Sequence, residues 1–226
     1  MRRVTGVLRH PRATMAEVVR HPAFITTWVV VLLVSAVCGG LLLSTPIGRQ
    51  ALVDERVRVT EALGGRVDDA AYDRLRSAPP VSIYLTSGGR LLLTPPVTLL
   101  VAAGLVALAR FHGARVTFVT ALAIAVHATV VLALQQVVVA PLHYVNESLT
   151  SPTNLAGMLR LFDEGSLPAR LFGTIDVFGV WWMWLLGVGL GAATGRPARQ
   201  YVWRLLAVYL GIAASVAAVF AIFGDV

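Results

Sequence analysis

The stretch Leu171–Gly195 reads LFGTIDVFGVWWMWLLGVGLGAATG and decides the class of fold. Apart from Asp176 it holds no charged residue. It is long enough to cross a ~30 Å hydrocarbon core, which takes roughly 20 residues. An ionisable group at membrane depth is costly. The stretch therefore predicts a transmembrane helix and marks Asp176 as a candidate functional residue.

The composition of the whole chain agrees with a membrane protein. Apolar residues make up 57% of the chain, charged residues only 14%, and the mean hydropathy is +0.75. A soluble domain of this size could not bury so much apolar surface. All 19 basic residues are arginine, which is typical of G+C-rich coding and favours a bacterial source. The arginines are scattered between apolar runs, so an anionic lipid surface is favoured over nucleic acid as a partner.

Four further apolar runs predict a five-transmembrane-helix bundle, an all-α membrane protein. Pro95 and Pro96 remove two backbone donors, so the second span is expected to be kinked there or to begin there. The single cysteine, Cys38, excludes an internal disulfide and a cysteine-based metal site. The expected spans are about 24–44, 91–110, 116–141, 171–194 and 201–223.

The arginines also predict the orientation of the bundle. With the N-terminus in the cytoplasm, the inner segments are 1–22, 110–115 and 195–204, with ten arginines in about 38 residues. The outer segments, 45–90 and 143–170, have nine arginines in about 74 residues and as many acids. Because cytoplasmic connections carry the excess of arginine, we expect an N-in/C-out protein of the cell inner (plasma) membrane.

The chain divides into a cytoplasmic, amphipathic N-terminal lead-in over 1–22 and a five-span membrane domain over 23–226. Thr14 and Glu17 form a T-x-x-E capping box, which predicts the start of a short helix. The lead-in is either an interfacial anchor or a plain juxtamembrane segment, and the sequence leaves both open. The side chains expected to face lipid are Met15, Val18 and Val19.

The 45–90 connection is the largest soluble piece. Charged and aliphatic residues alternate with a helical period over 50–63, and Gly64-Gly65 ends that pattern. A second helix is expected over 68–77, where two acids at the start favour the helix dipole. The pair predicts a small helical hairpin, and a solvated connector is favoured over a partner-binding module. A short helix is also expected within 154–163.

Five polar residues in or near the spans are the candidate site residues: Asp176, Thr174, His127, Gln135 and Gln136. Asp176 is expected to lie at the depth of Gln135 or Gln136 and to bond one of them, with His127 about two turns deeper. A relay or an intramembrane hydrolase would also need a nucleophile or a metal shell, and neither H-E-x-x-H nor G-x-S-x-G occurs. Hydrogen bonding between helices is therefore favoured, and no catalytic, metal or cofactor site is predicted.

Small residues predict how the last two spans pack. Gly187, Gly191 and Gly195 recur every four residues on one face of the fourth span, and Ala207, Gly211 and Ser215 do so on the fifth. Small residues at this spacing let helix backbones approach closely. Since the connection between these spans is short, they are expected to be antiparallel neighbours.

These features together resemble the Yip1 domain family of multi-pass membrane proteins. The resemblance rests on the five-span layout and on three segments: His10-Pro11-Arg12-Ala13-Thr14-Met15 followed by Pro22, the turn Arg110–Arg115, and Asp176-Val177-Phe178-Gly179-Val180-Trp181 before a glycine-rich span. The family's eukaryotic members are Golgi and endoplasmic-reticulum proteins that interact with Rab-type GTPases and other membrane proteins. The long acidic N-terminus of those members is missing here, so Rab binding is not expected.

The resemblance implies neither catalysis nor a cofactor. We therefore expect a non-enzymatic membrane protein that organises membrane proteins or lipids, with the lipid bilayer, other membrane proteins or a second copy as partners and no nucleic acid. The alternative is a permease-type subunit of a transporter, with an intramembrane enzyme using His127 and Asp176 as a weaker third class.

Overall fold

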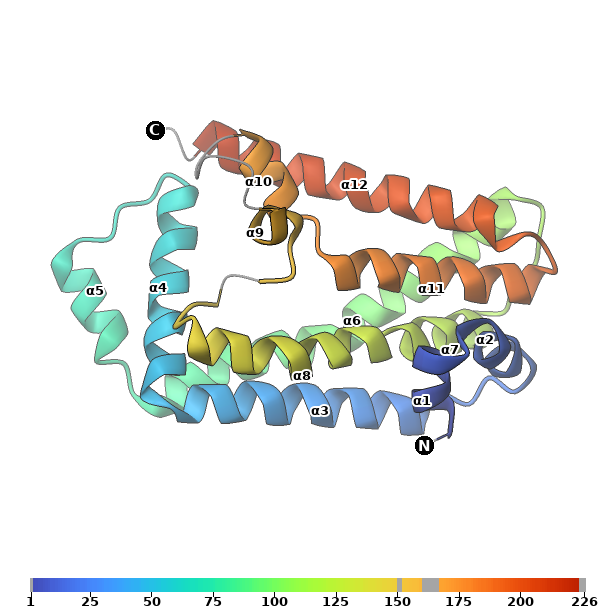
Figure 1. The fold of residues 1–226 in the computed structure, drawn as a ribbon, viewed down its shortest axis with the longest axis horizontal. Coiled ribbons are helices and arrows are strands. Elements are labelled where there is room, and N and C mark those ends of the chain that lie inside the picture. The colour runs from blue at the N-terminus through green and yellow to red at the C-terminus, as the bar shows by residue number, and fades with distance from the viewer. Residues whose placement is uncertain (1, 150–151, 160–166, 224–226) are drawn as a thin grey trace. The chain divides into compact units, whose positions relative to one another are not determined.

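The computed structural model is all-helical over the residues it describes, which are 2–149, 152–159 and 167–223. Figure 1 shows the helices in chain order. They are α1 Arg2–Arg9, α2 Pro11–Arg20, α3 Ile25–Ser44, α4 Pro46–Ala62, α5 Asp69–Arg76, α6 Pro80–Phe111, α7 Phe118–Ala128, α8 Val130–Val145, α9 Leu155–Leu159, α10 Leu167–Gly173, α11 Val177–Thr194 and α12 Ala198–Phe223.

Five helical segments are long and apolar enough to cross a membrane, as the sequence predicts. They are Ile25–Ser44, Leu91–Phe111, Phe118–Val145, Val177–Thr194 and Ala198–Val219. Large apolar side chains along the first and last of them are exposed, so these spans contact the lipid bilayer. The third span differs, because 67% of its most apolar window is buried, against 11% in the first and fifth. The third span therefore supplies much of the protein interior.

Two spans depart from the expected outline. The second lies within one helix, α6, which begins at Pro80 and continues through Pro95 and Pro96, so a start at the proline pair is wrong. Proline is tolerated inside membrane helices where neighbouring groups compensate for the lost donor. The third span is interrupted at the buried Thr129, where α7 ends and α8 begins; the Thr129 hydroxyl donates to the carbonyl of Val126 at 2.7 Å.

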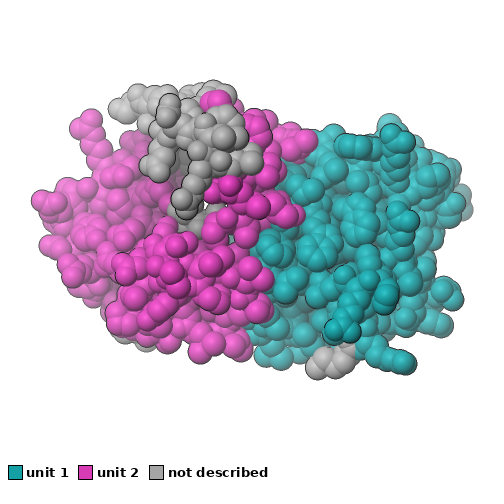
Figure 2. All heavy atoms as spheres, in the orientation of Figure 1, with its two compact units in different colours: residues 1–35, 90–135, 178–209 teal, residues 36–89, 136–177, 210–226 magenta. Residues whose placement is uncertain are grey.

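The described chain divides into two compact units (Figure 2). Unit 1 comprises Met1–Ser35, Arg90–Gln135 and Phe178–Tyr209, and unit 2 comprises Ala36–Gly89, Gln136–Val177 and Leu210–Val226. The units differ sharply in charge. Unit 1 contains eleven arginines and a single acid, Glu17, whereas unit 2 contains eight arginines and eleven acids.

The N-terminal segment of unit 1 forms a helical hairpin, α1–α2, which lies against α7. The predicted capping box is wrong: α2 begins at Pro11 with His10 as its N-cap, and the Thr14 hydroxyl donates to the carbonyl of His10 at 3.0 Å. Proline at the first helical position starts the helix one turn earlier, because its missing N–H needs no partner there. Helix α1 was not expected from the sequence.

The apolar face of this hairpin points into the protein. Met15 and Val18 are fully buried together with Val7 of α1, so the expectation that Met15 and Val18 face lipid is wrong. The two helices approach closely at Gly6, where an added Cβ would lie 2.6 Å from the Thr14 hydroxyl. Arg3 links them further, since it pairs with Glu17 at 3.1 Å and donates to the carbonyl of His21 at 2.8 Å.

Unit 2 contains the expected hairpin of the large connection, formed by α4 and α5. Thr45 caps α4 by accepting from the N–H of Gly48, and Asp68 caps α5 by accepting from the N–H of Ala71. The short helix expected within 154–163 is α9, and residues 160–163 of that range lie outside the described part of the chain.

Candidate functional site

The polar centre of unit 1 is His127, which is fully buried near the end of α7. Its Nδ1 lies 2.8 Å from the carbonyl oxygen of Ala123, and its Nε2 lies 3.1 Å from the hydroxyl of Thr27 on α3. A carbonyl only accepts, so Nδ1 carries a proton; in the neutral ring, Nε2 then accepts from the Thr27 hydroxyl. Both ring nitrogens are bonded, and the ring joins the first span to the third.

The polar centre of unit 2 is Asp176, which directly precedes α11. Its carboxylate accepts a hydrogen bond from the hydroxyl of Thr153 at 2.6 Å. The backbone repeats this connection, because the N–H of Leu155 bonds the carbonyl of Ile175 and the N–H of Val177 bonds that of Thr153. Asp176 thus fastens the α8–α9 connection to the start of the fourth span. This partner could not be found from the sequence, since Thr153 lies in a polar connection.

The other candidate residues are Thr174, Gln135 and Gln136. The Thr174 hydroxyl donates to the carbonyl of Leu171 at 2.7 Å and lies 3.4 Å from that of Ala213 on α12. Gln135 is half-buried and Gln136 is exposed. The expected bond between Asp176 and either glutamine stays a prediction.

The glycines of α11 place two other helices of unit 1 close to it. A Cβ added to Gly187 would lie 2.8 Å from the backbone nitrogen of Val202, and one added to Gly191 would lie 2.8 Å from Cα of Ala198, both on α12. Gly189 faces another way, toward Ile124 of α7. Close approach of backbones is what small residues permit in membrane helices.

The remaining small residues of the predicted stripes lie elsewhere. Gly195 ends α11 with φ +66, a left-handed conformation typical of the residue after a helix. Gly211 and Ser215 are exposed, and an added Cβ at Gly211 would meet nothing within 4 Å. Close contacts between the α11 glycines and α12 therefore lie at Ala198 and Val202 in the first turns of α12, and at Tyr209, whose hydroxyl lies 2.6 Å from the position of a Cβ on Gly179.

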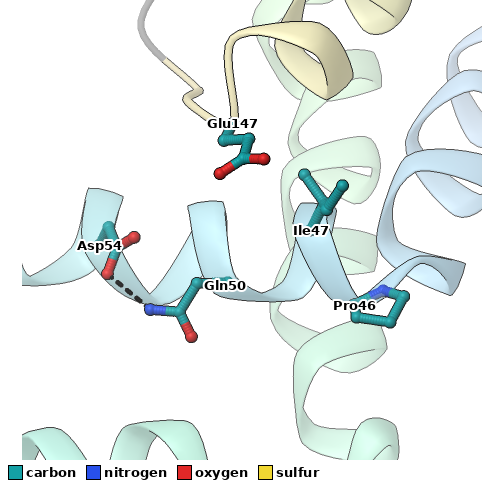
Figure 3. A pocket seen from close by; sticks show the side chains of 5 residues that line it. All are labelled: Pro46, Ile47, Gln50, Asp54 and Glu147. Atoms are coloured by element: carbon teal, nitrogen blue, oxygen red, sulfur yellow. Dashed lines mark hydrogen bonds between the residues drawn. The ribbon is translucent and has the colours of Figure 1, made fainter.

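Unit 2 also has an open cavity of about 310 Å³, which the sequence analysis missed (Figure 3). Pro46, Ile47, Gln50 and Asp54 of α4 line it together with Glu147, which follows α8. Glu147 adopts φ 50, and its side chain faces α4 from above. The Gln50 amide donates to Asp54 at 2.9 Å and to the Tyr72 hydroxyl at 2.7 Å, so these groups tie α4 to α5.

The described residues contain no group of three or more His, Cys, Asp or Glu side chains placed to hold a metal ion. The side chains that carry potential chemistry are instead divided between two places: His127 with Thr27 in unit 1, and Asp176 with Thr153 in unit 2. In each place the chemistry present is a hydrogen bond between two elements.

Comparison with known proteins identifies the architecture. No curated protein and no solved structure matched the chain. The Yip1 domain matches residues 5–222, which takes in most of the α1–α2 hairpin and all five spans. This confirms the resemblance drawn from the His10–Met15 segment and the Asp176–Trp181 segment. The chain therefore belongs to the Yip1 domain family, a family of generally non-enzymatic, multi-pass membrane proteins.

Proposed function

We propose that this protein is a non-enzymatic organiser of membrane proteins or lipids in the bacterial inner membrane. The observation that carries the proposal is that the buried His127 and the half-buried Asp176 form hydrogen bonds with other protein groups. Both ring nitrogens of His127 bond to protein groups, and the carboxylate of Asp176 holds the Thr153 hydroxyl. Hydrogen bonds of this kind stabilise helix packing, and they suit a scaffold better than a transport path.

The exposed spans supply the surface that such a role requires. The most apolar windows of α3 and α12 are each 11% buried, and Val29, Leu33 and Val208 are among their exposed side chains. These faces are open to lipid or to the helices of another membrane protein. A permease-type transporter subunit, the alternative, would need a hydrated path through the spans.

We further propose the N-in/C-out orientation. Its support is the charge of the two units, because unit 1 contains eleven arginines against one acid and also both short connections, α6–α7 and α11–α12. Short connections rich in arginine stay in the cytoplasm. The hairpin α1–α2 and both connections then lie on the cytoplasmic side.

The organiser role is tested by photo-crosslinking in cells. A photoreactive residue at Val208, which is 60% exposed, should give adducts with a reproducible set of membrane proteins or with lipid. The same residue at the buried Leu186 should give adducts within the chain only. Two results together would favour the transporter subunit instead. A membrane ATPase would be enriched in every adduct set, and cells from which the gene is deleted would lose uptake of a solute.

A further inference from the structure

Two connections of unit 1, α6–α7 and α11–α12, come together at one end of that unit (Figure 1). The guanidinium of Arg196 lies 4.0 Å from the position that a Cβ would take on Gly113. The rings of His112 and Tyr201 meet edge to face, with centroids 5.2 Å apart. Each connection turns through a left-handed glycine, Gly113 at φ +67 or Gly195 at φ +66, which keeps the turns short.

The two connections are strongly basic. Residues 110–117 and 195–204 include five arginines and no acid: Arg110, Arg115, Arg196, Arg199 and Arg204. All five are exposed, and in the described part of the chain none of them forms an ion pair. The first turn of α12 adds the partial positive charge of a helix N-terminus. An anion here would meet an uncompensated positive field.

A second observation points to a ligand rather than to a general surface charge. Three polar atoms beside the basic turns are buried and have no hydrogen-bond partner: His112 Nε2, Gln200 Nε2 and Tyr201 Oη. The Tyr201 side chain is fully buried. Two of these atoms, Gln200 Nε2 and Tyr201 Oη, are donors, and a buried donor without a partner is costly, so the pair calls for an acceptor.

The chemistry of these three groups selects the acceptor. The Gln200 amide nitrogen and the Tyr201 hydroxyl donate, whereas the His112 ring is held by its Nδ1, which faces the carbonyl of Leu108 at 2.7 Å. A group with several anionic oxygens, accepting from arginine and from neutral donors at once, matches this set.

We infer that these two connections form a binding site for a phosphoryl anion, the headgroup phosphate of an anionic phospholipid. Arg196 makes the first contact from the exposed side, and the half-buried Gln200 donates to the phosphoryl oxygens, with Tyr201 behind it. The membrane boundary supplies such headgroups beside the ends of α6 and α12. The site does not depend on the organiser role, because an organiser and a transporter subunit could each hold a lipid here.

The test is a lipid titration of the purified full chain in mild detergent, read by native mass spectrometry. Phosphatidylglycerol should bind, and phosphatidylcholine should not compete with it. Arg196→Gln should weaken phosphatidylglycerol binding about tenfold, as expected for the loss of a charge-assisted hydrogen bond. Tyr201→Phe, which removes one hydroxyl and keeps the ring, should weaken it about threefold.

The matched control is Arg76→Gln on α5, which removes the same charge from an exposed position of unit 2. An equal loss of binding in Arg76→Gln and Arg196→Gln, or unchanged binding in Arg196→Gln, would overturn the site. Displacement of the lipid by millimolar inorganic phosphate would assign the site to free phosphate and overturn the lipid as its occupant. If Arg196→Gln does not fold, the Tyr201→Phe titration decides by the same criterion.

Discussion

His127 and Thr27 join the third and first spans through one buried hydrogen bond, 3.1 Å long. The partners are a hundred positions apart in the chain. Histidine on an apolar helix invites a catalytic interpretation, yet the ring nitrogens already bond to Ala123 and Thr27. At the scale of single residues, the buried His127 therefore connects two helices through its hydrogen bond to Thr27.

Thr27→Val should therefore destabilise the protein by about 1 kcal/mol, because it keeps the shape of the side chain but leaves His127 Nε2 without a donor. Thermal unfolding in detergent, followed by circular dichroism, measures the loss. Thr26→Val, at the neighbouring exposed position, is the control and should change little. The double variant Thr27→Val/His127→Phe should recover part of the loss, and a purely additive result would show that the two residues are not coupled.

Asp176 gives the second residue-scale prediction. Asn keeps an oxygen that accepts from the Thr153 hydroxyl, so Asp176→Asn should stay within about 0.5 kcal/mol of the parent protein, whereas Asp176→Leu should lose about 1–3 kcal/mol. Unfolding in detergent and expression level are the measurements. Thr153→Val should lose a similar amount, and combining it with Asp176→Leu should add little. If the well-folded Asn variant fails to complement a deletion phenotype, the charge itself is needed, and the transporter or enzyme alternative gains support.

Among the elements, α11 is the one on which close packing depends most. Its glycines face two helices: Gly187 and Gly191 lie against the first turns of α12, and Gly189 lies against α7. The three tryptophans before them, Trp181, Trp182 and Trp184, are half-buried against the core of unit 1.

Gly187→Ala should be destabilising even though alanine is a better helix former than glycine. The added Cβ would lie 2.4 Å from a methyl of Val202 and 2.8 Å from its backbone nitrogen, so the helices must shift apart. We expect a loss of about 1–3 kcal/mol, typical of overpacking. Gly211→Ala is the matched control, because its Cβ would meet open space, and it should be neutral or stabilising by up to about 1 kcal/mol. Equal losses at both glycines would contradict the packing described here.

For the whole molecule, the charge difference between the two units predicts the topology. In a chain with Cys38 replaced by serine, Ala70→Cys in the α5 helix should react with an impermeant thiol reagent in intact spheroplasts. Arg199→Cys, exposed in the first turn of α12, should react only after lysis. The opposite labelling pattern would reverse the orientation and move the basic connections of unit 1 to the outer face.

The number of spans, the helical hairpin of the large connection and the family followed from the sequence alone. Each depends on local or compositional features: the length of an apolar run, a glycine pair at 64–65, or the two acids at the start of the 68–77 segment. Such features act within one or two helical turns, so they can be found without knowing the neighbouring elements. At α2 the local pattern predicted the wrong start, because the helix begins at Pro11 and not at the capping box of Thr14.

The faces that pack, and the partners of the polar groups, were decided only by the tertiary structure. The spans are apolar on all sides, so periodicity does not distinguish a buried face from one that contacts lipid. Gly187 and Gly211 therefore belong to equivalent patterns of small residues in the sequence. In the structure, a Cβ added to Gly187 would meet Val202, whereas a Cβ added to Gly211 would meet open space. The sequence likewise does not reveal that Met15 is buried, or that the Thr153 hydroxyl bonds the carboxylate of Asp176. These contacts join residues far apart in the chain, and close packing of specific side chains selects them.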